Sequence, residues 1–224
     1  MTFTILGRCD RTGQLGGAVT TSDIAVGARV LFARAGLGVA ATQHRTDPRL
    51  GPLVLERLVL GDSPSDAVRA VAGGTPDRAW RQLGAVDAAG RSGAWSGSRL
   101  WPIGAELAGP GCLALGNMLD GDDVAPAMRH AFAEAAGSPL AQRLLDALAA
   151  GEAAGGERDG RLRSAALLIV DRQSFPFADL RIDDDADPLG RLQALWEAYG
   201  PLASQFVARA VTPDDVQPSS STTT

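Results

Sequence analysis

The chain has 224 residues, of which 45% are hydrophobic and 21% charged, a length and balance that fit one large globular domain. Its formal net charge is −5, and all 21 basic residues are arginines scattered among acidic residues, which excludes Schiff-base and P-loop lysine chemistry and disfavours nucleic-acid binding. No run approaches the roughly 20 apolar residues that span a bilayer, and no secretory signal is visible. We therefore expect a cytoplasmic protein that binds neither nucleic acid nor membranes.

The predicted elements form alternating blocks of strands and helices. Period-two alternation identifies strands, and apolar residues at helical spacing after Ser or Pro identify helices. In chain order, strands are predicted at 2–9 and 15–22, as a pair within 30–42, and at 82–87, 91–96, 112–115, 164–170 and 178–182. Helices are predicted from about 53 to 61, from 63 onward through 71, and at 123–135, 139–149, 189–196 and 202–211. This order favours antiparallel sheets covered by blocks of helices.

The same reading divides the chain into one domain and a tail. Residues 1–213 are predicted to form a single domain, in which the Gly- and Ala-rich segment 151–161 is a loop. Residues 214–224, which end in a run of Ser and Thr, are predicted to be a disordered tail.

Cysteine and histidine are scarce, which bears on metal and redox chemistry. Cys9, Cys112, His44 and His130 do not stand at zinc-ligand spacings, so the sequence predicts neither a metal site nor a cofactor. We interpret both cysteines as small buried hydrophobic residues, because a reducing cytosol disfavours a disulfide.

Several short segments, in order along the chain, resemble one known family. They are MTFTILGR at 1–8, IAVGAR at 24–29, RAGLGVAATQ at 34–43, TDPRLGP at 46–52, GNML at 116–119, AGGE at 154–157, SAALL at 164–168 and DLRID at 179–183. The chain resembles the domain of unknown function 1028 family, which belongs with the N-terminal-nucleophile hydrolase fold. The resemblance implies an α+β, four-layer αββα sandwich, with two antiparallel sheets between helical layers.

The resemblance also implies a nucleophile at Thr2. In that superfamily the mature chain begins with Thr, Ser or Cys, whose side chain attacks an amide carbonyl while its own α-amine takes the proton. A threonine hydroxyl is a weak nucleophile without a base, and a free α-amine has a pKa of about 7.7–8.0, suited to that task. Met1 must be removed, which the small second residue favours. The alternative is that Thr2 is only the first residue of a strand.

Five other residues are candidates for binding near the nucleophile. Thr4 shares a strand face with Thr2 by period-two alternation and is predicted to line the pocket. Ser22 and Asp23 end the second strand, where superfamily relatives hold an acidic or hydroxyl group, although turn-favouring polar residues also suit that place. Arg163 is a candidate clamp for a substrate carboxylate, next to Ser164 at the start of a buried strand.

Two further pairs are candidates for an oxyanion hole or for amide recognition. Thr42 and Gln43 end a buried strand, where backbone N–H groups and a side-chain amide can stabilise an oxyanion. Gly116 and Asn117 end another apolar run. Polar residues that mark a strand exit or a turn are the alternative interpretation of both pairs.

Two functions remain open from the sequence. One is hydrolysis of a small N-acyl or amide compound by Thr2, without a cofactor. The other is a non-catalytic module for small-molecule binding or assembly, favoured because the chain lacks the lysine that proteasome subunits place beside their nucleophile. A homo-oligomer is expected in either case.

Overall fold

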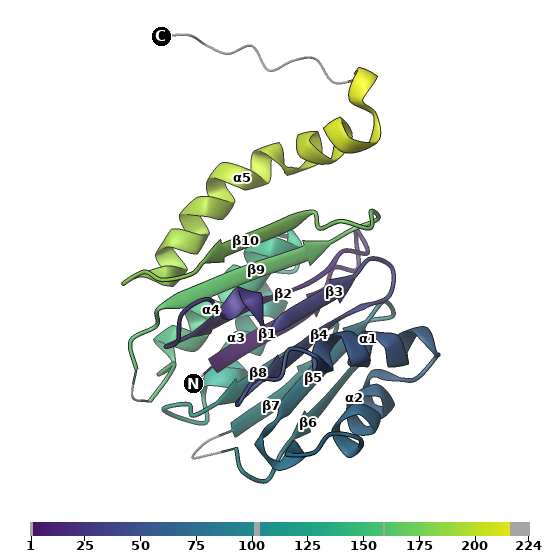
Figure 1. Ribbon diagram of the computed structural model, residues 1–224. Coiled ribbons are helices and arrows are strands. Elements are labelled where there is room, and N and C mark those ends of the chain that lie inside the picture. The colour runs from purple at the N-terminus through teal and green to yellow at the C-terminus, as the bar shows by residue number, and fades with distance from the viewer. Residues whose placement is uncertain (1, 101–103, 159, 216–224) are drawn as a thin grey trace.

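The computed structural model in Figure 1 describes residues 2–100, 104–158 and 160–215. Over these residues the protein is α+β, with two antiparallel sheets and five α-helices, which confirms the predicted mixed class at this level. Within the same ranges, no helix has both the length and the apolar character that crossing a membrane requires.

The larger sheet has six strands in the order β10-β9-β2-β1-β8-β7, so the first strand of the chain lies inside it. Its register places Thr2 opposite Thr21 on one side and Asn117 on the other. The bounds are β1 (Thr2–Arg8), β2 (Leu15–Thr21), β7 (Gly104–Gly109), β8 (Cys112–Asn117), β9 (Ser164–Val170) and β10 (Ala178–Ile182).

The smaller sheet has four strands in the order β3-β4-β5-β6 and packs against the larger one. Gly84 lies at the closest approach, because a Cβ there would stand 2.5 Å from the Leu115 side chain of the other sheet. The bounds are β3 (Leu31–Arg34), β4 (Gly38–Gln43), β5 (Gln82–Asp87) and β6 (Ser92–Ser96).

Two pairs of helices cover different sheets, and a fifth helix runs along one edge (Figure 1). The helices α3 and α4 pack on the six-stranded sheet, α1 and α2 pack on the four-stranded sheet, and α5 contacts β9 and β10. The bounds are α1 (Leu50–Val59), α2 (Pro64–Gly73), α3 (Val124–Glu134), α4 (Leu140–Ala153) and α5 (Pro188–Val211).

Alternation along β1 decides which side chains face the second sheet. Phe3 and Ile5 are buried in the cluster formed with α3 and α4, whereas Leu6 is buried in the cluster between the two sheets. Because neighbouring side chains on a strand point to opposite faces, Thr2 and Thr4 share the inter-sheet face of Leu6.

The structure differs from the predicted elements in three places. The two helices predicted at 189–196 and 202–211 form the single helix α5, which contains Pro201. A proline removes one backbone hydrogen bond, and here the rings of Tyr199 and Phe206 contact each other across it, with centroids 5.3 Å apart. The strand β7 was not predicted, because its sequence GAELAG contains only one large apolar side chain. Helix α4 continues to Ala153, into the segment predicted as a loop from residue 151.

The predicted tail falls largely outside the described residues. Pro213–Asp215 form a short 3₁₀ turn after α5, and residues 216–224 lie beyond the described range.

Candidate functional site

Thr2 stands at the open end of β1, between two strands that end beside it. Its Oγ1 lies 3.2 Å from Oγ1 of Thr21, and the residue is 8% exposed. Asn117, its other sheet neighbour, is 1% exposed. The hydroxyl of Thr2 is therefore held in place and lies at the floor of an accessible site rather than in the core.

A pocket of about 440 Å³ opens over this position, a size that suits a small ligand. Strand ends and the loops after them supply its lining, so four segments distant in sequence meet there. Its polar lining residues are Thr2, Thr21, Asp23, Arg29, His44, Arg45, Thr46 and Asn117. We call this hollow the Thr2 pocket.

Strained backbone is concentrated around the Thr2 pocket. His44, Arg45 and Met118 line it, and they have φ angles of 54°, 46° and 58°. Among the described non-glycine residues only Ala25 and Asp77 also have positive φ. Such conformations cost free energy and persist only where the surrounding structure imposes them, a pattern typical of functional sites.

A network of buried amide side chains lies beneath the pocket. Thr4 donates to Oε1 of Gln43 at 2.6 Å, and Nε2 of Gln43 donates to Oε1 of Gln82 at 2.7 Å. Nδ2 of Asn117 donates to the same oxygen at 3.3 Å, and Gln82 donates onward to the carbonyl of Ala105. Oδ1 of Asn117 is buried without a hydrogen-bond partner among the described residues. It is therefore an unsatisfied acceptor at the floor of the Thr2 pocket.

The structure separates the predicted oxyanion residues. Asn117 lines the pocket, whereas Gln43 is fully buried and committed to the network. Thr42 donates its hydroxyl to the Asp47 carbonyl and its backbone N–H to the Val30 carbonyl, which fixes the end of β4. Gly116 lies within the sheet, where a Cβ would stand 2.6 Å from the Leu119 side chain.

Of the remaining predicted binding residues, one lines the Thr2 pocket and the others are engaged in bonds outside it. Asp23 lines the pocket. Ser164 donates its hydroxyl to the Asp23 carbonyl at 2.6 Å and accepts from the Val26 N–H, so it braces the loop that carries Asp23. The guanidinium of Arg163 is exposed and bound by both carboxylate oxygens of Asp184. Thr4 belongs to the buried network, and Ser22 contributes its backbone.

The bond from Ser22 identifies a residue that the sequence did not single out, Glu157. The Ser22 N–H lies 3.1 Å from each carboxylate oxygen of Glu157, and Glu157 also pairs with Leu119 through a β-bridge. Ser22 directly follows Thr21, and Leu119 follows Asn117 by two residues. The carboxylate therefore crosses the end of the sheet just beyond Thr2. Burial raises its pKa to about 6.

His44 was also missed as a site residue. Its Nδ1 lies 2.9 Å from the Trp80 carbonyl, which can only accept, so Nδ1 carries the proton and Nε2 is left as an acceptor. Burial lowers the pKa of His44 from 6.5, which keeps the ring neutral at pH 7. A neutral imidazole therefore lines the Thr2 pocket.

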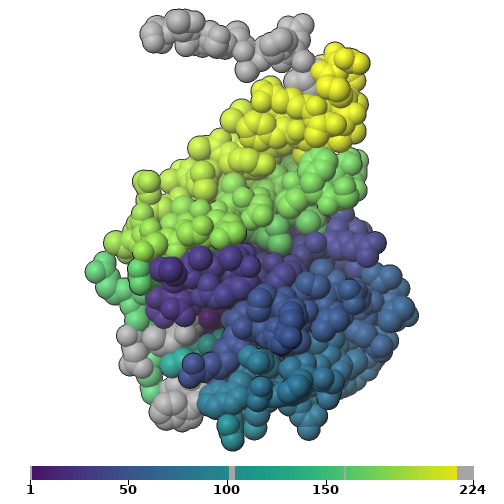
Figure 2. Space-filling model, in the orientation of Figure 1, coloured from purple at the N-terminus to yellow at the C-terminus, as the bar shows by residue number. Residues whose placement is uncertain are grey.

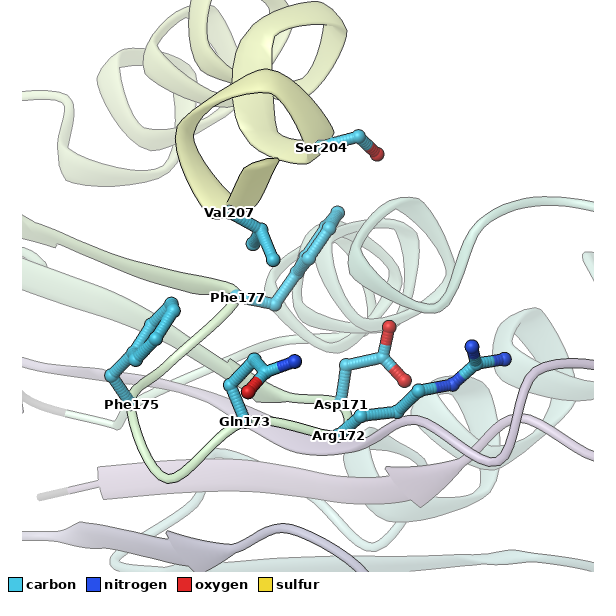
Figure 3. A pocket seen from close by; sticks show the side chains of 7 residues that line it. All are labelled: Asp171, Arg172, Gln173, Phe175, Phe177, Ser204 and Val207. Atoms are coloured by element: carbon cyan, nitrogen blue, oxygen red, sulfur yellow. The ribbon is translucent and has the colours of Figure 1, made fainter. Parts of the chain in front are cut away.

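A second hollow lies between α5 and the turn after β9, and Figure 3 shows it. Its volume is about 200 Å³, and we call it the α5 pocket. The side chains of Phe177 and Val207 face each other across it (Figure 3). None of its seven lining residues has a positive φ or a buried polar atom without a partner. The Thr2 pocket, by contrast, has three lining residues with positive φ and the unpartnered oxygen of Asn117.

Metal chemistry has no obvious place in the part of the chain that the structure describes. No group of three His, Cys, Asp or Glu side chains there could hold an ion. Cys9 and Cys112 are buried and not bonded to each other.

Comparison with known proteins places the chain in one family. A family of unknown function, DUF1028, matches residues 2–192. The crystal structure of a Silicibacter pomeroyi protein of that family is 36% identical, with 88% of each chain covered and a TM-score of 0.82. Anbu (ancestral beta-subunit) from Yersinia bercovieri is 13% identical over 92% of this chain and 96% of its own, with a TM-score of 0.40, a likeness too weak to argue from. No curated protein matches this chain.

Proposed function

The chain belongs to the DUF1028 family, and on that premise we propose that it is an amide hydrolase for small N-acyl or amide compounds, with Thr2 as the nucleophile. One observation carries the proposal. The Thr2 hydroxyl faces a pocket of ligand size at the free end of a central strand, and a buried carboxylate, Glu157, crosses just beyond that strand end.

The proposed chemistry needs removal of Met1, which leaves Thr2 with a free α-amine. The amine takes the proton from Oγ1 as that oxygen attacks the carbonyl carbon, and then gives it to the leaving nitrogen. The acyl group remains as an ester on Thr2 until water hydrolyses it. Between the two proton transfers the amine is an ammonium group, and Glu157, beyond the end of β1, stabilises it by charge.

Positive charge at the pocket wall supports the same chemistry. Nη1 of Arg29 donates to the carbonyls of Ile24 and Ala25 at 2.6 and 2.8 Å, which fixes the guanidinium in place. Its Nη2 is 3.9 Å from the Asp23 carboxylate, too far for a close hydrogen bond. A preorganised cation near a developing oxyanion lowers the barrier, because it needs no reorganisation during the reaction.

The finer fold assignment belongs to this proposal. We assign the two sheets and their covering helices to the four-layer αββα sandwich of N-terminal-nucleophile hydrolases, as one domain over residues 1–213. The support is the placement of three hydrophobic clusters, one under each helical pair and one between the sheets.

The test is a hydrolysis screen of small amides with the processed protein and three variants. Thr2→Ala should lower turnover roughly 10³-fold or more, while Thr2→Ser, which keeps a hydroxyl, should retain part of it. Thr12→Ala, in an exposed turn, is the matched control and should match the wild type. Turnover that Thr2→Ala leaves intact would reject the proposal.

A non-catalytic binding module is the second candidate, favoured by the absence of lysine from the sequence. It predicts that the wild type and Thr2→Ala bind the same small molecules with equal affinity and that neither turns any of them over.

A further inference from the structure

Beside the Thr2 pocket, two cationic side chains and one neutral imidazole lie against the ring of Trp80. The guanidinium carbons of Arg45 and Arg99 lie 5.6 and 5.1 Å from the centre of the Trp80 ring, and the His44 ring stacks on it with centroids 6.0 Å apart. Such stacking orients a guanidinium while leaving its edge free for hydrogen bonds. Trp80 is thus a platform that presents positive charge next to the site.

Arg45 joins this platform to the Thr2 pocket. It lines that pocket and also an adjoining hollow of about 330 Å³, together with Asp77, Trp80 and Arg81. Its backbone is held at a φ of 46°, and its carbonyl accepts a hydrogen bond from Nη1 of Arg81. We call the Arg45 and Arg81 pair the arginine ledge.

The charges of the arginine ledge are not neutralised by a close carboxylate. Within the described residues, no acidic oxygen lies within 4.0 Å of a guanidinium nitrogen of Arg45, Arg81 or Arg99, whereas nine other arginines are paired in that way. Asp77 lines the same hollow without reaching that distance. In a chain of net charge −5, this local excess of cations indicates an anionic ligand.

Two buried polar atoms in the same region lack partners, and they differ in kind. Nε of Arg81 is a donor and Oδ1 of Asn117 is an acceptor. A buried polar group without a partner is costly, so a ligand that satisfies both gains affinity. A carboxylate would satisfy the donor, and an N–H group would satisfy the acceptor.

We propose that the substrate of the Thr2 pocket is an amide that carries a carboxylate, as an N-acyl amino acid does. The arginine ledge binds the carboxylate, Asn117 accepts from the amide N–H, and the acyl carbonyl faces Thr2. This inference rests on the proposed function for the identity of the scissile bond, but the recognition of the carboxylate does not depend on turnover.

The experiment therefore measures binding to Thr2→Ala, which keeps the pocket and lacks the nucleophile. The probes are the N-acetyl derivatives of the twenty amino acids, each paired with the corresponding carboxamide. Binding of each probe to the full chain is measured by ligand-observed NMR and by calorimetry. We expect at least one acid to bind about tenfold or more tightly than its carboxamide, with the difference shrinking as salt rises.

Variants of the arginine ledge test whether Arg45 is responsible for the tighter binding of the acid. Arg45→Gln in the Thr2→Ala background should abolish the preference for the acid, and Arg45→Lys should keep part of it. Arg209→Gln is the matched control, because Arg209 also stacks on an aromatic ring, Phe206, but lies far along α5. Equal affinity for every acid and its carboxamide, no binding by any acid, or an unchanged preference in Arg45→Gln would overturn the proposal. If the acid still binds more tightly than its carboxamide but the wild type turns over no amide, the proposed hydrolase activity is refuted and the recognition of the carboxylate is not.

Discussion

The Thr2 pocket and the α5 pocket lie in different surroundings, and the contrast shows what marks a site. The Thr2 pocket is formed where the strands of two sheets end, so its side chains are fixed by the register of β1 with β2 and β8. The α5 pocket lies under a helix that forms a ridge along one edge of the molecule (Figure 2). Much of the apolar surface of that helix is exposed, including Leu202 at 45%.

The difference is one of polar chemistry rather than of shape. Both hollows are open to solvent, but the Thr2 pocket holds strained backbone, a buried carboxylate nearby and an unpartnered amide oxygen. A protein tolerates such costs where they serve binding or catalysis, so they discriminate between hollows better than volume does.

The largest effect on kcat/KM is expected when one polar residue is replaced in each pocket and the two variants are compared. Asn117→Ala removes the amide beside Thr2 and should lower kcat/KM for an amide substrate roughly 10²-fold. Ser204→Ala removes the hydroxyl that lines the α5 pocket and should leave kcat/KM unchanged. Steady-state kinetics of both variants measure this. Equal losses would remove the distinction between the pockets.

The buried amide network should dominate stability at the Thr2 end. Gln82→Leu leaves the amide groups of Gln43 and Asn117 without their shared acceptor, and should lower the free energy of unfolding by about 2–4 kcal/mol. Gln193→Leu breaks the half-buried amide pair with Gln142 near α5 and should cost about 1 kcal/mol or less. Urea unfolding tests both, and a reversed order would contradict the account.

Glu157 should make stability fall as pH rises. Burial raises its pKa from 4.5 to about 6, so the folded protein binds this proton more tightly than the unfolded chain. The resulting stabilisation is complete below pH 4.5 and lost above about 6, a change of about 2 kcal/mol. Glu157→Gln should abolish this contribution.

The measurement compares urea unfolding at pH 4.5 and 7 for the wild type and Glu157→Gln. Other titrating groups contribute equally to both proteins, so the difference between their pH responses isolates Glu157. Glu134→Gln, on an exposed part of α3, is the control and should respond to pH as the wild type does. An identical response in Glu157→Gln would show that Glu157 is not held in the described environment.

The smallest expected effect is at the α5 end. The Tyr199 hydroxyl donates to the Phe177 carbonyl at 3.1 Å, so Tyr199→Phe should lower the free energy of unfolding by about 1 kcal/mol. Amide turnover should not change, because this bond is remote from the Thr2 pocket. A loss of turnover with normal stability would couple the two regions against our expectation.

Local patterns in the sequence predicted most strands and helices, whereas features that depend on contacts between residues further apart were missed. Alternation identified β1 and β2, and the Ser63 N-cap identified α2. The break predicted between residues 196 and 202 is wrong, because α5 continues through Pro201 with Tyr199 and Phe206 packed together across it.

The candidate site was only half predictable for a related reason. Thr2, Asp23 and Asn117 were identified, and all three line one pocket. Gln82 was missed because its role depends on the pairing of β5 with β4, which places it opposite Gln43. Glu157 was missed because it reaches the end of β1 from a distant loop. Pairing between distant segments leaves no period in a single sequence.

The most direct test of the central claim is the intact mass of the protein purified from its own cells, combined with sequencing of its first residues. The account predicts a mature chain that begins at Thr2 and lacks one methionine. A chain that retains Met1 in its active preparation would contradict it, because the α-amine of Thr2 would then be locked in a peptide bond.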